Sequence, residues 1–251
     1  MKIVVIGGTG LIGSQLVSLL QKNGQDVIAA SPNTGVNSIT GEGLAEALAN
    51  TSVLVDVSNS PSFADDDVLN FFKTSTGNLI AVAKNAGVKH IIILSVVGTQ
   101  KLQESGYFRA KQVQEDLLKN AGIAYTIVHA TQFFEFASGI AHTSILDGKI
   151  HLSTAHIQPI ASSDVASFLA KTALSEPTNS IVEIQGPEKF SMNEWIAQYA
   201  KATNKDFEII ADTNALYYGA SLTDDTLIAA DAKFTGKTVY NEWINIDANK
   251  K

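Results

Sequence analysis

The segment Lys2-Ile3-Val4-Val5-Ile6-Gly7-Gly8-Thr9-Gly10-Leu11-Ile12-Gly13 decides the fold of this 251-residue chain. A short apolar strand runs into a glycine-rich turn, and a helix is expected from Leu11 to about Asn23. Gly8, Gly10 and Gly13 have the spacing of a dinucleotide-binding motif. Glycine in such a motif permits the tight turn, lets a pyrophosphate approach the backbone and allows the helix to pack closely on the strand. The first amides of the helix are donors for phosphate oxygens. The segment therefore predicts a nucleotide site, and the alternative is a tight turn alone.

The first half of the chain alternates strands and helices. Nearly continuous apolar runs are typical of strands buried on both faces of a parallel sheet. Further strands are expected at 26–30, 53–57, 89–97 and 124–129, and helices at 66–86 and 106–121. This order predicts an α/β fold with a Rossmann-type doubly wound parallel sheet.

After His129 the predicted elements become shorter. We expect a helix at 164–174, a strand at 180–184, and a capping box, Ser191 to Glu194, that opens a helix at 192–202. Residues 207–210 and the segment after Thr238 are expected to form a terminal lobe. The prediction is an NAD(P)-binding Rossmann core at 1–131, with contributions from about 162–186, and a small C-terminal α+β substrate lobe at 132–161 and 187–251.

Composition excludes several classes of function. The chain has no cysteine, which excludes disulfides, thiolate catalysis and cysteine metal sites within it. Its five histidines show no helical metal-binding pair, so no metal site is expected. The net charge is −7 with no basic cluster, which argues against nucleic acid and anionic membranes as partners. No apolar run approaches the roughly 20 residues that cross a bilayer. A cytoplasmic location is the default expectation, and the oligomeric state stays open.

Three residues form a candidate catalytic group. Tyr107 and Lys111 lie four residues apart, about one helical turn, and Ser95 ends the fourth strand. The carboxyl ends of parallel strands form the ligand crevice of such a sheet, which also receives the glycine turn. A nearby ammonium lowers the pKa of a tyrosine, so Tyr107 could protonate a carbonyl oxygen to which Ser95 donates a hydrogen bond. Otherwise, Tyr107 is a half-buried aromatic and Lys111 a solvated side chain.

The second strand bears on the choice of cofactor. An acid at its end would bind the ribose hydroxyls of NAD, and none occurs between Val27 and Gly41. No lysine or arginine is present there for a 2′-phosphate either, so Ser31, Asn33, Thr34 and backbone amides would have to hold it. The sequence favours NADP, with NAD possible; these residues are also typical of a simple turn.

Together these stretches resemble the short-chain dehydrogenase/reductase superfamily, and more closely its atypical NmrA-like branch of NAD(P)H-binding proteins. Supporting stretches include Leu94-Ser95-Val96-Val97-Gly98 and Thr131-Gln132-Phe133-Phe134. The resemblance implies a Rossmann core, a small substrate lobe and cofactor contacts from several loops. The implied cofactor contacts are Gly7, Thr9, Gly10, Leu11, Ile12, Gly13, Ser31, Asn33, Val57, Ser58, Asn59, Ser95, Lys111, Ala130, Thr131 and Phe133.

The branch includes NADPH-dependent quinone and carbonyl reductases and redox-sensing regulators that do not turn the cofactor over. We expect an NADPH-dependent oxidoreductase acting on a small carbonyl or quinone, in a pocket lined by Phe133 and Phe134. Lys111 would bind the nicotinamide ribose. A catalytically silent NADP(H) sensor is the alternative, and a nucleotide-sugar epimerase is a third. Two positions depart from the family pattern: His129-Ala130 replaces Arg-Pro, and the register of Asn78, the candidate relay asparagine, is not fixed by sequence.

Overall fold

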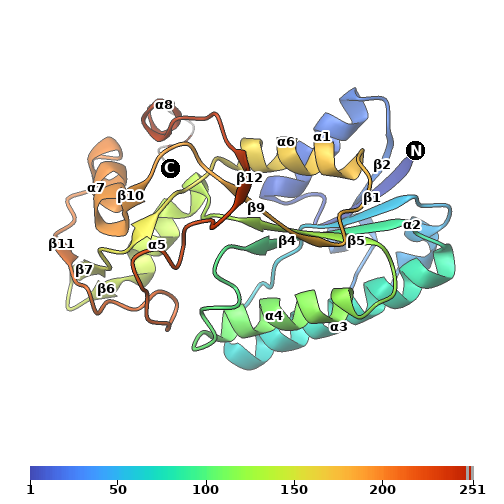
Figure 1. Cartoon of the computed structure of the whole chain (residues 1–251), viewed down its shortest axis with the longest axis horizontal. Helices are drawn as coiled ribbons and strands as arrows, with labels where there is room; N and C mark the ends of the chain where they lie inside the picture. Colours follow the sequence, from blue (N-terminus) through green and yellow to red (C-terminus); the bar gives the residue numbers. More distant parts are fainter. Residues whose placement is uncertain (247–248, 250–251) are drawn as a thin grey trace. The chain divides into compact units, whose positions relative to one another are not determined.

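The computed structural model describes residues 1–246 and 249. Its central seven-stranded sheet has the order β12-β9-β5-β4-β3-β1-β2, and β1 pairs in parallel with both β2 and β3 (Figure 1). The predicted Rossmann-type α/β fold is confirmed. The strands of this sheet are β1 (Lys2–Ile6), β2 (Asp26–Ala30), β3 (Val53–Asp56), β4 (His90–Val96), β5 (Tyr125–Ala130), β9 (Ser180–Gln185) and β12 (Ala232–Thr235).

The chain divides into two compact units. The first comprises Met1–Ser95, Gly106–His129 and Val165–Val182. Its helices α1 and α6 cover one face of the sheet, and α3 and α4 cover the other (Figure 1). The helical elements lying wholly or mainly in this unit are α1 (Leu11–Lys22), η1 (Pro32–Thr34), α2 (Leu44–Leu48), α3 (Asp65–Ala86), α4 (Gly106–Lys119) and α6 (Ser162–Ala173).

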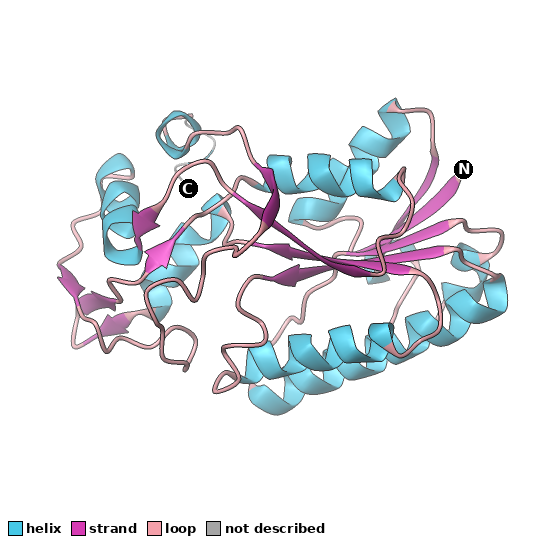
Figure 2. Cartoon of the chain, in the orientation of Figure 1, coloured by secondary structure: helices cyan, strands magenta, loops and turns pink. Residues whose placement is uncertain are grey.

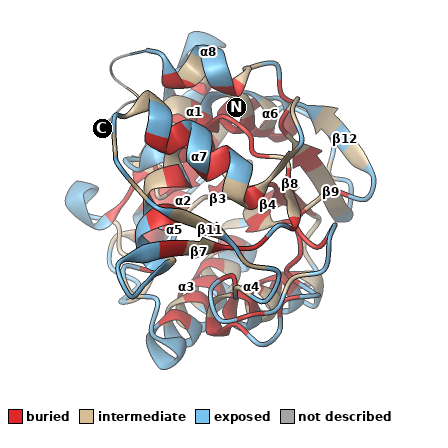
Figure 3. Ribbon diagram, turned by 90° about the vertical axis from the view of Figure 1, so that its left-hand side faces the viewer, coloured by how far each residue is buried: buried red, intermediate tan, exposed pale blue. Residues whose placement is uncertain are grey.

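The second unit comprises Val96–Ser105, Ala130–Asp164 and Glu183–Lys251. Figure 2 shows its short strands, which form a three-stranded sheet, β11-β7-β6, and a two-stranded sheet, β10-β8. Figure 3 shows that helix α7 carries both buried and exposed residues. Trp195 and Tyr199 are among its buried residues. The remaining elements are η2 (Phe134–Phe136), α5 (Ala137–Thr143), β6 (Ile145–Leu146), β7 (Lys149–Leu152), β8 (His156–Ile157), β10 (Phe190–Ser191), α7 (Met192–Ala202), β11 (Ile209–Ala211) and α8 (Tyr240–Ile244).

Burial explains why the sheet strands form. All four residues of β3 are buried, as are the first four of β4, in agreement with the apolar runs Val53–Val55 and Ile91–Leu94 that these strands contain. The side chains of Val4, Leu54, Ile91 and Ile127 belong to one core cluster. This core fixes the carboxyl ends of β1, β3 and β4, from which the candidate site residues extend. Among residues 1–246 and 249, no helix is both long and apolar enough to cross a membrane.

Candidate active site

The glycine turn between β1 and α1 leaves no room for a side chain at Gly7, Gly8 or Gly13. A Cβ on Gly8 would lie 2.7 Å from Ala29 Cα, and one on Gly13 would lie 2.1 Å from the Gly7 carbonyl oxygen. Gly7 has φ of +76°, in the left-handed region that glycine favours, and a Cβ there would lie 2.9 Å from Ser58 N. The backbone of the turn is therefore packed closely against β2 and the loop after β3.

The start of α1 has the features of a phosphate site. Gly10 is the N-cap, no side chain bonds to the helix amides there, and the first turn contains no acid. Backbone donors at a helix start attract anions because their N–H groups point outward and the helix dipole is positive there. Thr9 and Leu11 are exposed and Ile12 is buried. These observations fit the pyrophosphate of a dinucleotide, with Gly7 to Gly13 holding it through backbone groups.

The loop after β2 uses its hydroxyl groups to hold its own shape. Ser31 N donates to Thr34 Oγ1 at 2.9 Å, and that hydroxyl donates to the Ala29 carbonyl oxygen at 2.9 Å. Ser31 is buried, whereas Asn33 is exposed. Thr34 is also exposed, but its hydroxyl is engaged within the loop, so Asn33 offers an exposed amide to a ribose or its phosphate.

Asp56, at the end of β3, was not singled out by the sequence. Its Oδ1 accepts hydrogen bonds from Ser58 N at 2.9 Å and Ser58 Oγ at 2.6 Å. Burial raises the pKa of Asp56, although the bonds from Ser58 and the charge of Lys111 oppose that rise. The carboxylate fixes Ser58, and with it the loop that carries Val57 and Asn59.

Tyr107, in the first turn of α4, reaches this same loop. Its hydroxyl donates to Asn59 Oδ1 at 3.3 Å. Its half-buried ring contacts Phe63, Phe72 and Phe108 with centroid separations of 5.6, 6.1 and 5.6 Å. The aromatic contacts hold the ring while the hydroxyl lies at the loop after β3.

Lys111 lies one turn further along α4 and is buried, with 2% of its surface exposed. Its Nζ donates to the Leu94 carbonyl oxygen at 2.9 Å and to Gln114 Oε1, and lies 4.4 Å from the centroid of the Phe72 ring. Burial lowers the pKa of Lys111 to about 8, although the carboxylates of Asp56 and Glu115 oppose that change. The lysine side chain is therefore held inside the first unit by bonds to a backbone carbonyl and to Gln114.

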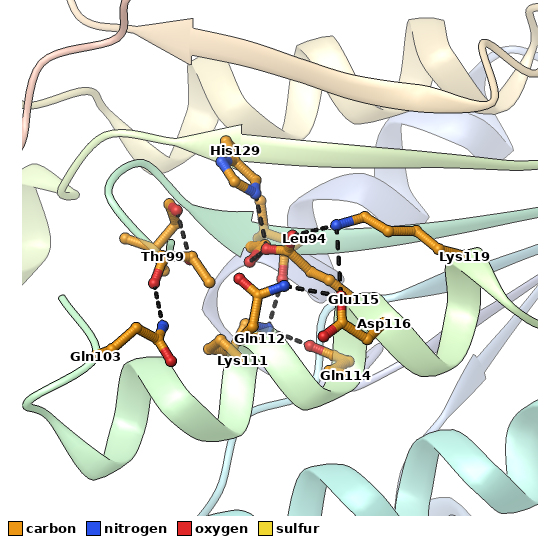
Figure 4. Close-up of polar contacts among 12 residues, drawn as sticks. Leu94, Thr99, Gln103, Lys111, Gln112, Gln114, Glu115, Asp116, Lys119 and His129 are labelled. Carbon is orange, nitrogen blue, oxygen red and sulfur yellow. Dashed lines mark hydrogen bonds and ion pairs between the residues drawn. The ribbon is translucent and has the colours of Figure 1, made fainter. Parts of the chain in front are cut away.

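Two adjacent residues of α4, Gln114 and Glu115, connect the site to other strands. Gln114 Nε2 donates to Asp56 Oδ2 at 3.1 Å, so Gln114 bridges the carboxylate and Lys111. Ser95 Oγ donates to Glu115 Oε1 at 2.7 Å. His129 Nε2 lies 2.7 Å from the same oxygen, and Figure 4 shows this contact between His129 and Glu115. Sequence reasoning missed Gln114 and Glu115; their signal is helical spacing, three and four residues after Lys111.

The other predicted contacts belong to the second unit. Thr131 Oγ1 donates to the Gln158 carbonyl oxygen at 2.6 Å, and Phe133 forms a bridge with Ile160. Phe134 is buried against the rings of Tyr240 and Trp243, at 4.9 and 5.4 Å between centroids. The roles of Ala130, Thr131, Phe133 and Phe134 toward ligands stay predictions.

Asn78, the candidate relay asparagine, makes contacts of a different kind. Its Nδ2 donates to the carbonyl oxygens of Ser38 and Ile39, each at 2.9 Å. These bonds hold the segment that precedes α2 against α3. No group of three or more histidine or acidic side chains that could hold a metal occurs within residues 1–246 and 249.

Residues 7–177 match the sequence profile of a family described as NAD(P)H-binding. The chain belongs to this NAD(P)H-binding family. The match begins at the glycine turn and covers α4. It therefore includes the candidate phosphate site and also Tyr107 and Lys111. NAD(P)H binding by the predicted dinucleotide fold is thereby confirmed, as is the resemblance to atypical short-chain dehydrogenase/reductase proteins.

Two curated relatives show what else the chain is similar to. The photosystem II assembly factor Ycf39 of Cyanophora paradoxa is 29% identical over 199 residues, which cover 72% of this chain and 62% of the relative. The chloroplastic divinyl chlorophyllide a 8-vinyl-reductase of Cucumis sativus is 30% identical over 225 residues, covering 74% of this chain and 53% of the relative. This chain therefore spans less than two thirds of either relative.

Solved structures share the fold at low identity. MoeE5 in complex with UDP-glucose and NAD has a TM-score of 0.74 at 17% identity, covering 100% of this chain and 98% of that one. The NADPH-dependent quinone oxidoreductase QOR2 of Escherichia coli, complexed with NADPH, has a TM-score of 0.68 at 19% identity, covering 96% and 98%. These likenesses support the Rossmann fold of the family.

Proposed function

We propose that this protein is an NADPH-dependent oxidoreductase that transfers hydride to a small carbonyl or quinone. The observation that carries the proposal is the position of Tyr107, whose hydroxyl reaches the loop after β3 in the unit that contains the glycine turn. A cofactor sensor needs a binding site but has no need of a proton donor. The family supports a reductase in general terms, and the substrate class is the finer proposal.

Tyr107 and Lys111 of α4 each have a part in this chemistry. The reduced nicotinamide supplies the hydride when it is bound. Tyr107 gives its proton to the carbonyl or quinone oxygen as negative charge develops there. Lys111 stabilises the phenolate that remains and binds the nicotinamide ribose by exchanging one of its internal hydrogen bonds for a ribose hydroxyl. With a pKa of about 8, its ammonium is present at neutral pH. When Lys111 passes a proton to Tyr107, a proton from solvent restores the ammonium before the next turnover.

A preference for NADPH over NADH forms part of the proposal. The segment between Val27 and Gly41 contains no acid that would repel a 2′-phosphate. Asn33 is exposed in η1, just after β2, and can donate its amide to that phosphate. Neutral donors discriminate less than arginine, so the preference should be modest.

A catalytically silent NADP(H) sensor is the second candidate. The internal bonds of Lys111 to Leu94 and Gln114, and of Ser95 to Glu115, favour it because both side chains are engaged within the unit. One relative carries the name of an assembly factor, which suits a binding role. An epimerase acting on nucleotide sugars is less favoured, because the sequence has no basic cluster to hold a sugar-nucleotide diphosphate. A cytoplasmic location and a substrate lobe in the second unit stay predictions.

The test measures binding and turnover separately. NADPH and NADH are titrated by fluorescence, and cofactor oxidation is followed with quinones, aldehydes, ketones and a conjugated vinyl compound. Tyr107→Phe should lower kcat about 100-fold or more while the NADPH Kd is unchanged. Tyr125→Phe, at the other end of the sheet, is the matched control and should change neither. Tight NADPH binding without turnover of any acceptor would overturn the enzyme in favour of the sensor, and tighter NADH binding would overturn the cofactor preference.

A further inference from the structure

The loop between β3 and α3 presents an exposed aromatic ring. Phe63 is 56% exposed, although an apolar side chain of this size gains free energy from burial. The backbone on either side of it is fixed, because Ser62 Oγ donates to Asp67 Oδ2 at 2.8 Å and Ala64 N donates to Ser62 Oγ at 3.2 Å. The loop therefore keeps Phe63 at a defined place with much of its ring open to solvent.

Phe63 lies beside Tyr107, the proposed proton donor. The centroids of the two rings are 5.6 Å apart, and the ring planes are inclined at 38°. Asn59, four residues before Phe63 in the same loop, accepts the hydrogen bond of the Tyr107 hydroxyl at 3.3 Å. One loop of the first unit thus contacts both the ring and the hydroxyl of Tyr107.

The start of α3 holds this loop close to the start of α4. Asp65, the first residue of α3, forms a salt bridge with Arg109 of α4 at 2.6 Å. A Cβ on Gly106 would lie 1.9 Å from Asp65 Oδ1, so the absence of a side chain at Gly106 permits the close approach of the two helix starts. This approach sets the position of Phe63 relative to Tyr107.

The other rings against Tyr107 have a different character. Phe72 and Phe108 contact the Tyr107 ring edge-on and are 0% and 2% exposed. They are core residues that hold the tyrosine in place. Phe63, by contrast, retains aromatic surface that a ligand can cover.

We infer that Phe63 is a specificity-determining residue that packs against a flat, conjugated acceptor, so that aromatic carbonyl compounds are preferred to saturated ketones of similar size. This inference rests on the proposed function, which makes Tyr107 the proton donor. To take that proton, an acceptor must place its oxygen within about 3 Å of the Tyr107 hydroxyl. The groups on its carbonyl carbon then lie beside the loop that carries Phe63, where a second aromatic ring is attracted in an offset or edge-on arrangement.

The attraction between two aromatic rings sets the size of the effect. Beyond the area that it buries, such a pair is equivalent to a factor of about 2 to 12 in affinity. Phe63→Leu removes the ring but keeps an apolar side chain, so it should remove this factor for an aromatic acceptor alone. Phe63→Tyr keeps a ring of the same shape and should keep the preference.

The experiment compares acetophenone with cyclohexyl methyl ketone, which carry the same methyl ketone on a flat and on a saturated ring. The aromatic preference is the ratio of kcat/KM for acetophenone to that for cyclohexyl methyl ketone, with NADPH as reductant. Comparing this ratio between proteins cancels the intrinsic reactivity of the two ketones. Ligand-observed NMR measures the Kd of each ketone from the NADP⁺ complex, which provides a readout that needs no turnover.

Phe63→Leu should lower the aromatic preference about 2- to 12-fold, and the ratio of the two Kd values should change by a similar factor. Phe63→Tyr should leave both ratios within about 2-fold of the wild type, since the ring remains. Phe168→Leu is the matched control and should change neither ratio. Phe168 is a half-buried ring of the same unit, but it lies on α6, which covers the opposite face of the sheet from α4 (Figure 1).

Failure of the inference and failure of the proposed function give different results. If Phe63→Leu slows both ketones equally and leaves both ratios unchanged, Phe63 only supports Tyr107 and the inference alone is overturned. An equal change of the ratios in Phe63→Tyr also overturns it, because the ring is still present there. A wild type that binds NADPH but reduces no acceptor overturns the proposed function, and the Kd ratio then decides whether Phe63 contacts the flat ring. A wild type that neither binds nor reduces either ketone overturns the inference.

Discussion

Gly13→Ala tests whether the glycine turn needs its close backbone packing. Gly13 lies in the first turn of α1, and a Cβ there would lie 2.1 Å from the Gly7 carbonyl oxygen and 2.7 Å from Gly8 Cα. Both neighbours are backbone atoms, so no side chain can rotate away to make room. The turn must open for the methyl group to fit, which moves the backbone groups that face the pyrophosphate.

The magnitude follows from two opposing effects. Overpacking costs about 1–3 kcal/mol, and a contact this short with backbone belongs at the upper end of that range. Replacing glycine by alanine within a helix stabilises the helix by about 0.5–1 kcal/mol. The net loss is about 2 kcal/mol, which for a chain of this length lowers Tm by about 4–8 °C. A shift of the turn that costs about 1.4 kcal/mol in binding weakens NADPH tenfold.

Thermal unfolding and NADPH titration of the Gly13→Ala variant provide the measurement. Gly77→Ala is the matched control, because Gly77 also lies within a helix, α3, and a Cβ there meets nothing within 4 Å. The control should raise Tm by about 1–4 °C, since only the gain in helix stability of about 0.5–1 kcal/mol remains. A Gly13→Ala protein that melts no lower than the wild type and binds NADPH equally well would refute the role assigned to the turn.

Two further predictions concern stability. Burial lowers the pKa of His90 from 6.5 to about 4, so the unfolded chain binds an extra proton between these values and folding stability falls as pH drops from 6.5 to 4. The loss of unfolding free energy reaches up to about 3 kcal/mol. Urea unfolding at pH 7 and 4.5 should show a smaller fall in unfolding free energy for His90→Gln than for the wild type. Equal falls in the two proteins would contradict the lowered pKa of His90. The buried Tyr240 hydroxyl has no hydrogen-bond partner within the part of the chain that the structure describes, and burial raises its pKa. Tyr240→Phe should therefore raise the unfolding free energy by about 1 kcal/mol; a decrease would mean that the hydroxyl is stabilising.

The long helices and the buried strands were predictable because each carries several residues of one periodic pattern. The helix expected from Leu11 is α1 of the first unit, and the helix expected at 192–202 has the bounds of α7 of the second unit. The apolar runs of β3 and β4 identified strands buried on both faces. By contrast, β6, β8 and β10 are two residues long, and α2 is five. Such segments are too short to show a hydrophobic period, so their secondary structure is determined by tertiary packing rather than by local sequence.

The spacing of Tyr107 and Lys111 predicted that they share one face of α4, but it could not predict which groups lie opposite. Asp56 lies on β3, and the β3–β4 register pairs it with Ile93, next to the Leu94 carbonyl that accepts from Lys111. This placement depends on how three elements pack together and is absent from any single segment.

A physical requirement nevertheless links these groups. A lysine that is 2% exposed needs acceptors, and a buried carboxylate needs donors, because either charge alone would be strongly destabilising. Gln114 meets the first need by joining Lys111 to Asp56, and His129 helps to meet the second at Glu115. The departure of His129 from the family pattern is thus accounted for by a contact with α4.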